Sequence, residues 1–233
     1  MKQPSGGRAT TRGTRAFTLI EMLLVIGIIG ILAGMLFTGG RLAVKKRTLA
    51  RATAELRQIA AAIEDFKSKY NYYPPDNPNN TLVNPLYYEL AGVSYTPTNT
   101  PVPGSPDRFD TLDKRTSLTA PQAFSVFGVS GFVNAAHPGK APPKSPFQPR
   151  GNQVAKVVSN TVPPTTFEML IAPGKGTNGL ADVDGKEINP WRYQSTAPAH
   201  NTRSFDLWAD IEINDQVFRV CNWNNTPQLL YSK

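Results

Sequence analysis

The sequence predicts an α+β protein, in which a long N-terminal helix packs against a small C-terminal antiparallel β-sheet and a loop-rich insertion separates the two. An apolar run over residues 17–37, followed by an amphipathic pattern that reaches the Pro74-Pro75 pair, predicts the helix. Short apolar segments between turn-forming residues fill the last third of the chain and predict the sheet. A helix with one apolar stripe and a sheet with one apolar face can cover each other.

The composition is that of one modest domain joined to one apolar segment. The chain has 233 residues, of which 40% are hydrophobic, and its formal net charge is +8. Residues 1–16 hold four basic and no acidic side chains, so much of that charge precedes the apolar run. The rest of the chain therefore gives no reason to expect a nucleic-acid partner. Cys221 is the only cysteine, which excludes an intrachain disulfide and a four-cysteine metal site.

Residues 1–16 are predicted to be a leader peptide. They are polar and basic, and the apolar segment follows them, whereas an ordinary secretory signal has its apolar region before the cleavage site. A cut between Ala16 and Phe17 would keep the apolar segment in the mature protein. As a helix, residues 17–38 would span roughly 30 Å, enough to cross the hydrocarbon core of a membrane.

Glu21 is the only charged residue in this apolar segment. A charge at the centre of a membrane helix costs about 2.5–3.5 kcal/mol, and such residues usually have a function. The run Phe17-Thr18-Leu19-Ile20-Glu21, directly after a basic leader, resembles the N-terminus of type IV prepilins and pseudopilins. The resemblance implies that a prepilin peptidase cuts before Phe17, that Phe17 is then N-methylated, and that Glu21 pairs with the terminal amine of a neighbouring subunit. Ala16 departs from the family, which most often has glycine before the cut.

Five glycines in the predicted helix are candidate packing and flexibility positions. Gly27, Gly30 and Gly34 lie on nearby helix faces, and small residues let membrane helices approach closely. Gly39 and Gly40 stand near the place where the family usually has a proline. Each weakens a helix by about 1 kcal/mol relative to alanine. We expect the helix to bend or melt there when subunits assemble.

Residues 39–73 are predicted to continue the helix as an amphipathic segment. Its apolar stripe has spacings of three, four and seven residues and consists of Leu49, Leu56, Ile59, Ile63, Phe66 and Tyr70. The helix itself is expected to end near residue 71, because Pro74 drives the residue before it away from helical geometry. The basic cluster from Arg41 to Arg51 is expected at lipid headgroups or on the solvated side of the helix, since no aromatic residue is interleaved with it.

The remaining chain is divided at residue 165. Residues 74–165 are predicted to be a loop-rich variable insertion with two short helices, near 84–90 and 117–129. Residues 166–233 are predicted to form a β-sheet region. Its candidate strands are 167–171, 191–193, 205–208, 211–213 and 217–220.

The C-terminal region carries a second resemblance, to the major pseudopilin of type II secretion. The segments that carry it are Asn189-Pro190-Trp191-Arg192-Tyr193, Phe205-Asp206-Leu207-Trp208 and Asn222-Trp223. The resemblance implies a calcium ion in a C-terminal loop, which would take oxygen ligands. The acids available there are Asp206, Asp210, Glu212 and Asp215. The family's Gly-Ala-Asp-Gly turn and paired aspartates are absent, so solvated surface acids are the preferred interpretation and calcium is the alternative.

We interpret the sequence as a structural subunit of a type II secretion pseudopilus rather than an enzyme. The expected partners are further copies in a helical filament, other pseudopilins, the prepilin peptidase, the inner-membrane assembly platform and membrane lipid. The expected location is the inner membrane, crossed once, with the C-terminal domain in the periplasm, and a periplasmic or surface filament after assembly. The alternatives are a major or minor pilin of a type IV pilus and a membrane-anchored periplasmic binding module that does not polymerise.

An enzyme is disfavoured by the absence of a catalytic constellation in the sequence. His137 and His200 are far apart and have no ligand-like spacing. The segment Gly128-Val129-Ser130-Gly131-Phe132 is not a nucleophile elbow, because Phe132 occupies the place of the second glycine.

Overall fold

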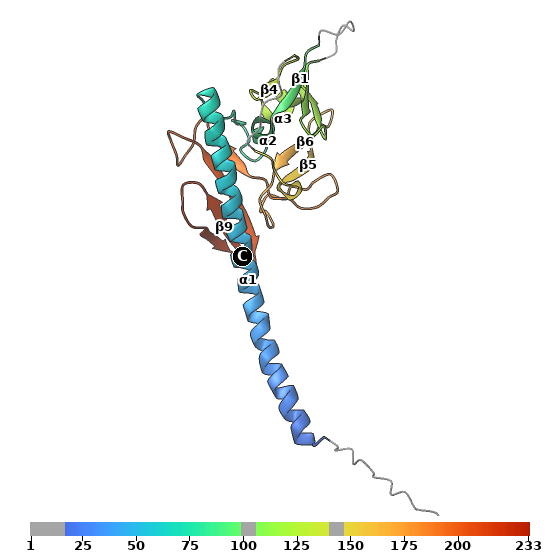
Figure 1. The fold of residues 1–233 in the computed structure, drawn as a ribbon, viewed down its shortest axis with the longest axis vertical. Coiled ribbons are helices and arrows are strands. Elements are labelled where there is room, and N and C mark those ends of the chain that lie inside the picture. The colour runs from blue at the N-terminus through green and yellow to red at the C-terminus, as the bar shows by residue number, and fades with distance from the viewer. Residues whose placement is uncertain (1–16, 99–105, 140–146) are drawn as a thin grey trace, which may run out of the picture. The chain divides into compact units, whose positions relative to one another are not determined.

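The protein has an α+β fold in which one long helix is followed by sheets whose strand pairs are antiparallel apart from β1 with β4 (Figure 1). The computed structural model describes residues 17–98, 106–139 and 147–233, and for residues 35–41 it describes the backbone alone. The chain divides after Val44 into two compact units. Helix α1 (Leu19–Tyr70) begins in the first unit and ends in the second. The predicted fold class is confirmed.

The first unit contains the apolar part of α1. Every large apolar side chain between Phe17 and Leu32 is exposed, by 44–82%. An apolar surface of this extent marks a site of interaction, because isolated soluble proteins rarely expose one. Among the residues whose side chains are described, no helix includes a stretch that is both long and apolar enough to span a membrane.

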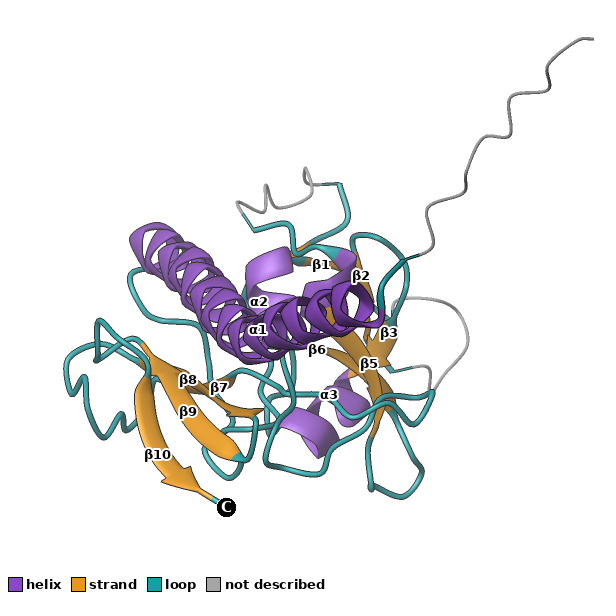
Figure 2. Ribbon diagram, turned by 90° about the horizontal axis from the view of Figure 1, so that it is seen from below, coloured by secondary structure: helices purple, strands orange, loops and turns teal. Residues whose placement is uncertain are grey.

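In the second unit, the amphipathic part of α1 packs on the core. Of the predicted stripe, Leu56, Ile59, Ile63 and Phe66 are at most 5% exposed, and the partly buried Leu49 and Tyr70 pack against the same core. The helix passes along the C-terminal sheet (Figures 1 and 2), and Lys45 Nζ of α1 lies 4.2 Å from the ring centroid of Phe218 on strand β9 (Gln216–Cys221). It ends at Tyr70, one residue earlier than expected, where Asn71 takes a left-handed backbone conformation (φ 65°).

The C-terminal sheet has four antiparallel strands in the order β10-β9-β8-β7. Strand β7 spans Arg192–Gln194, β8 spans Asp206–Ile213 and β10 spans Gln228–Ser232. The two segments predicted as 205–208 and 211–213 form the single strand β8, whereas β10 was not predicted. Alternate residues of β8 face the core, where Leu207, Ala209 and Ile211 are fully buried. One face of this sheet therefore supplies the surface that α1 covers.

The region predicted as a loop-rich insertion contains a second small sheet, of strand order β3-β2-β1-β4, and one strand of a two-stranded sheet, β5-β6. Both predicted short helices are present, as α2 (Leu86–Ala91) and α3 (Ala120–Phe127). The strands of these two sheets are β1 (Val93–Thr96), β2 (Arg108–Thr111), β3 (Ser117–Thr119), β4 (Ala135–Ala136), β5 (Val154–Val158) and β6 (Thr166–Leu170). Of these six strands, the sequence predicted β6 alone. A short 3-10 helix, Gly151–Gln153, precedes β5. These strands are at most five residues long.

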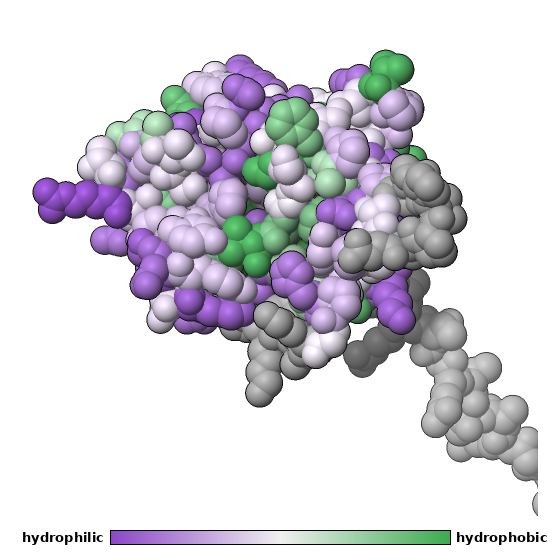
Figure 3. Space-filling model, turned by 90° about the horizontal axis from the view of Figure 1, so that it is seen from above, coloured by the Kyte–Doolittle hydropathy of each residue, from purple (hydrophilic) through white to green (hydrophobic). Residues whose placement is uncertain are grey.

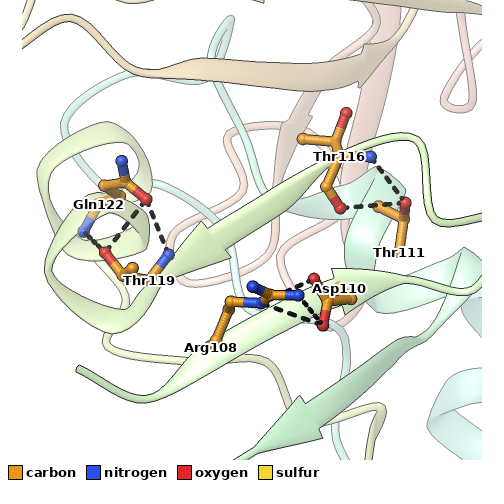
Figure 4. A network of polar contacts seen from close by, with 6 residues as sticks. All are labelled: Arg108, Asp110, Thr111, Thr116, Thr119 and Gln122. Carbon is orange, nitrogen blue, oxygen red and sulfur yellow. Dashed lines mark hydrogen bonds and ion pairs between the residues drawn. The ribbon is translucent and has the colours of Figure 1, made fainter. Parts of the chain in front are cut away.

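Side-chain hydrogen bonds hold the junction between β3 and α3 (Figure 4). Thr119 Oγ1 accepts from the backbone N–H of Gln122, and Gln122 Oε1 accepts from the backbone N–H of Thr119 at 2.9 Å. This reciprocal capping box satisfies two backbone donors at the start of α3. On the adjacent strand β2, Arg108 pairs with Asp110 at 3.0 Å. The face of the molecule drawn in Figure 3 is mostly hydrophilic, with apolar residues in small separate areas.

Candidate assembly site

Glu21 lies in the first turn of α1 and forms a capping box with Thr18. Glu21 Oε2 accepts from both the backbone N–H and the hydroxyl of Thr18, each at 2.8 Å. Thr18 Oγ1 in turn accepts from the backbone N–H of Glu21 at 3.3 Å. The carboxylate thus stabilises the start of its own helix, where backbone N–H groups have no partner in the helix and a negative charge is favoured.

This geometry leaves one oxygen of Glu21 available to a second partner. Glu21 Oε1 has no hydrogen bond to another residue in the described part of the chain, and the side chain is exposed. Phe17, the predicted first residue of the mature protein, directly precedes Thr18 and is 71% exposed. Ala16, the residue before the predicted cut, lies outside the described residues. Glu21 therefore lies within one helix turn of Thr18 and the predicted new terminus, and one of its carboxylate oxygens has no hydrogen bond in the described chain.

The predicted packing glycines lie on open parts of the helix surface. A Cβ added at Gly27, Gly30 or Gly34 would meet no heavy atom within 4 Å outside its own helix turn. The helix backbone continues through Gly39 and Gly40 without a break. Bending at these two residues upon assembly stays a prediction for the filament, because the chain described here is a single copy.

The acids proposed as calcium ligands are held by separate partners. Asp206 is 1% exposed and accepts from the backbone N–H groups of His200 and Asn201, each at 2.9 Å. Asp210 is 7% exposed and receives two hydrogen bonds from Arg219, at 2.7 and 2.9 Å. The interpretation of these two residues as solvated surface acids is wrong, because both stabilise buried parts of the sheet.

The other two acids lie toward the end of the β8–β9 hairpin. Glu212 pairs with Lys233 at 2.7 Å, and the pKa of the Glu212 carboxyl is lowered chiefly by its hydrogen bond with that ammonium group. Asp215 is exposed in the hairpin turn with a φ of 60°. Within the described ranges, no group of three or more His, Cys, Asp or Glu side chains is placed to hold a metal ion.

The residues of the C-terminal resemblance tie the sheet to its surroundings. Trp191 is 1% exposed, and the Tyr193 hydroxyl donates to the carbonyl of Pro74 just after the end of α1, at 2.9 Å. Asn222 joins two parts of the sheet: its Oδ1 accepts from the backbone N–H of Leu207 at 3.0 Å, and its Nδ2 donates to the carbonyl of Phe205 at 2.8 Å. These contacts give the motif residues a structural role.

Of the carboxylates that are buried outside these motifs, two accept hydrogen bonds from backbone N–H groups, and the sequence analysis singled out neither. Asp76 is 4% exposed and accepts from the backbone N–H groups of Ser195 and Thr196, at 2.8 and 3.0 Å. It fastens the segment after α1 to the segment after β7. The sequence offered one signal, the position of Asp76 directly after the Pro74-Pro75 helix stop.

Glu89 of α2 is the second of these carboxylates and is fully buried. It accepts from the backbone N–H groups of Val133 and Asn134, at 3.0 and 3.1 Å. Burial raises the pKa of the Glu89 carboxyl to about 7, and the two N–H donors act in the opposite direction. No sequence pattern distinguishes Glu89 from a surface acid on a short helix.

Comparison with known proteins gives one match. The prokaryotic N-terminal methylation motif matches residues 11–37, which include Ala16, Phe17 and Glu21. No curated protein and no solved structure matches the chain significantly. The motif is typical of proteins that a prepilin peptidase processes and that form filaments, a structural rather than an enzymatic class. The match supports a type IV pilin-like protein of prepilin type.

Proposed function

We propose that the chain is a structural subunit of a type II secretion pseudopilus. It is made as an inner-membrane precursor, cleaved between Ala16 and Phe17, N-methylated at Phe17 and polymerised through α1. The observation that carries this proposal is the methylation motif over residues 11–37, a range that includes Phe17 and Glu21. The tryptophan and asparagine motifs of the C-terminal sheet favour the pseudopilus.

The exposed apolar surface of α1 supports assembly through this helix. Burying a leucine- or isoleucine-sized side chain contributes about 1.5–3 kcal/mol, so neighbouring helices or lipid would stabilise this surface strongly. The open faces at Gly30 and Gly34 allow close helix contact. Glu21 is costly in such surroundings unless it is paired. The terminal amine of a neighbouring Phe17 supplies that pair, while Thr18 already satisfies one carboxylate oxygen.

A type IV pilus pilin is the second candidate. It shares the processing, the methylation and the helix, so the N-terminal motif favours both equally. Many pilins close a C-terminal loop with a disulfide, which the lone Cys221 cannot form within the chain. This difference favours the pseudopilus over the pilus. A membrane-anchored binding module would keep the leader and the helix but would form no regular multimers.

Substitutions at Glu21 test the proposal. We expect Glu21→Ala to be processed normally but to assemble poorly, because the neighbour's amine then has no counter-charge. Glu21→Asp should keep part of the assembly, since its shorter side chain retains the carboxylate. Glu64→Ala, an exposed acid further along the same helix, is the matched control and should assemble as the unsubstituted chain does. Normal amounts of sheared filament from Glu21→Ala cells would contradict the proposal.

A further inference from the structure

A groove with a volume of about 440 Å³ lies between α1 and the loop before β10. Its lining is largely apolar and consists of Leu49, Ala50, Thr53 and Ala54 from α1, Asn225 and Pro227 from the loop, and the cations Lys46 and Arg57. Both cations are exposed, and neither has an ion pair or hydrogen bond to another described residue. The groove therefore combines apolar surface with two positive charges that no described side chain neutralises.

A turn of opposite character lies elsewhere in the same unit. This acidic turn, residues 182–185, has the sequence Asp-Val-Asp-Gly. A β-bridge between Ala181 and Glu187 closes its base, and the backbone N–H of Gly185 donates to the carbonyl of Asp182 at 3.0 Å. Gly185 has a φ of 79°, which glycine adopts without strain. The hydrogen bonds give the acidic turn a defined shape, so it would lose little entropy on binding.

The acidic turn presents the groups that the groove lacks. Val183 is 46% exposed, although it is apolar. Asp184 is exposed, and its carboxylate has no partner among the described residues. An apolar side chain beside an unpaired negative charge complements an apolar groove with unpaired positive charges.

We propose that the acidic turn of one copy of this chain docks in the groove of a second copy. The turn cannot fill the groove of its own chain in this structure, because none of its residues lines that groove. The backbone N–H of Val183 instead donates to the carbonyl of Lys156 on β5, at 2.9 Å. The two surfaces differ, so the contact is head-to-tail and can repeat along an open filament. This inference rests on the proposed function, because assembly through α1 brings the copies together.

Any other occupant of the groove would also have to supply an apolar group and a negative charge. An anionic lipid headgroup or an acidic peptide of another protein would each meet Lys46 and Arg57. A second copy is favoured because the complementary turn belongs to the same chain and is therefore present at every step of a filament. The experiment below distinguishes these sources by what becomes linked to the groove.

Disulfide crosslinking between two versions of the full chain tests the contact. One version carries Ala54→Cys in the groove, and the other, with a different tag, carries Val183→Cys in the acidic turn. Each chain then has one exposed cysteine, since Cys221 is buried, so a disulfide between the two tags reports a contact between copies. Both versions are produced together in cells that have the assembly machinery, and the sheared filaments are oxidised. We expect the mixed disulfide as the main product.

Charge reversal then tests the complementarity. Lys46→Glu with Arg57→Glu in the groove chain should lower the yield of mixed disulfide about tenfold, and Asp184→Lys in the turn chain should restore most of it. Arg47→Glu is the matched control, an exposed cation on α1 that does not line the groove, and should leave the yield unchanged. If Asp184→Lys restores the yield of mixed disulfide, the first loss came from a broken contact, because a misfolded groove chain would not regain the disulfide.

The substitution Gly30→Cys in a parallel strain distinguishes failure of the docking contact from failure of the proposed function. Gly30→Cys crosslinks without the mixed disulfide, or charge reversals without effect, would overturn this inference and leave the proposed function standing. Loss of both crosslinks would contradict the proposed function itself. A disulfide between the groove cysteine and a different protein would also overturn the inference, because the groove would then have another occupant.

Discussion

At the scale of single residues, burial gives carboxylates of this chain different roles. Asp76 and Asp206 are buried beside backbone N–H groups and hold loops in place. Glu21 is exposed, and one of its oxygens accepts from Thr18 while the other has no hydrogen bond in the described chain. Burial raises the pKa of two buried glutamates, Glu168 and Glu89, and for Glu89 it does so to about 7 despite two N–H donors.

Glu89 predicts a pH dependence of folding stability. The pKa is about 7 in the folded chain and near 4.5 when the side chain is solvated. The unfolded chain therefore loses this proton first, and the stabilisation present below pH 4.5 is lost as pH rises toward 7. The loss is on the order of 3 kcal/mol. Denaturant unfolding of the mature protein in detergent at pH 5 and pH 8 measures it.

Glu89→Gln provides the control for this pH dependence. Glutamine fills nearly the same space but does not titrate, so most of the fall in unfolding free energy between pH 5 and pH 8 should disappear. Glu64→Gln, at an exposed position, should keep the slope of the unsubstituted protein. An equally steep slope in Glu89→Gln would assign the pH dependence to another group.

At the scale of elements, the amphipathic part of α1 organises the second unit. Its stripe packs with strands of the C-terminal sheet and of the insertion in one buried cluster. Ile63 is fully buried at the centre of the stripe. We expect Ile63→Ala to lower the free energy of unfolding by about 2–5 kcal/mol, because it removes buried methyl groups and leaves a cavity.

Ser68→Ala on the exposed side of the same helix is the control for that substitution. It should change the unfolding free energy by no more than about 0.5 kcal/mol, because a surface position loses no packing. Equal effects of the two substitutions in denaturant titrations would show that the stripe does not carry the packing of α1.

How far each element could be predicted depends on its length and pattern. The helix was predicted within two residues at each end, because its apolar pattern extends over many turns and Pro74 ends it. Strands β6, β8 and β9 were predicted because apolar and β-branched residues fill them. Strands β1 to β4 have two to four residues in a Pro-, Asn- and Thr-rich context, too short to show a period. Strand β10 has all five residues exposed and so lacks a buried alternating face.

The residues of the candidate site also differ in how far the sequence could predict them. Glu21 could be found from sequence because a charge in an apolar run is conspicuous. The burial of Asp206 and Asp210 could not, because it depends on Arg219 across the β8–β9 pair and on the backbone of the 200–201 loop. Such contacts arise only when the strands have paired and the loop has closed over them.

At the scale of the whole molecule, the two units differ in the surface that they present. The first presents an exposed apolar helix with the side-chain carboxylate of Glu21 in its first turn, and the second is a folded α+β body with its own core. In the proposed function, cleavage before Phe17 in the first unit creates the amine with which Glu21 of another copy would pair. The account therefore depends on where the mature chain begins.

The mass of the N-terminal peptide of the assembled protein tests this claim most directly. Filaments sheared from the native cells are digested, and the terminal peptide is sequenced by mass spectrometry. The account predicts a chain that starts at Phe17 and carries one methyl group on its terminal nitrogen. A functional, assembled protein that still starts at Met1 would contradict it.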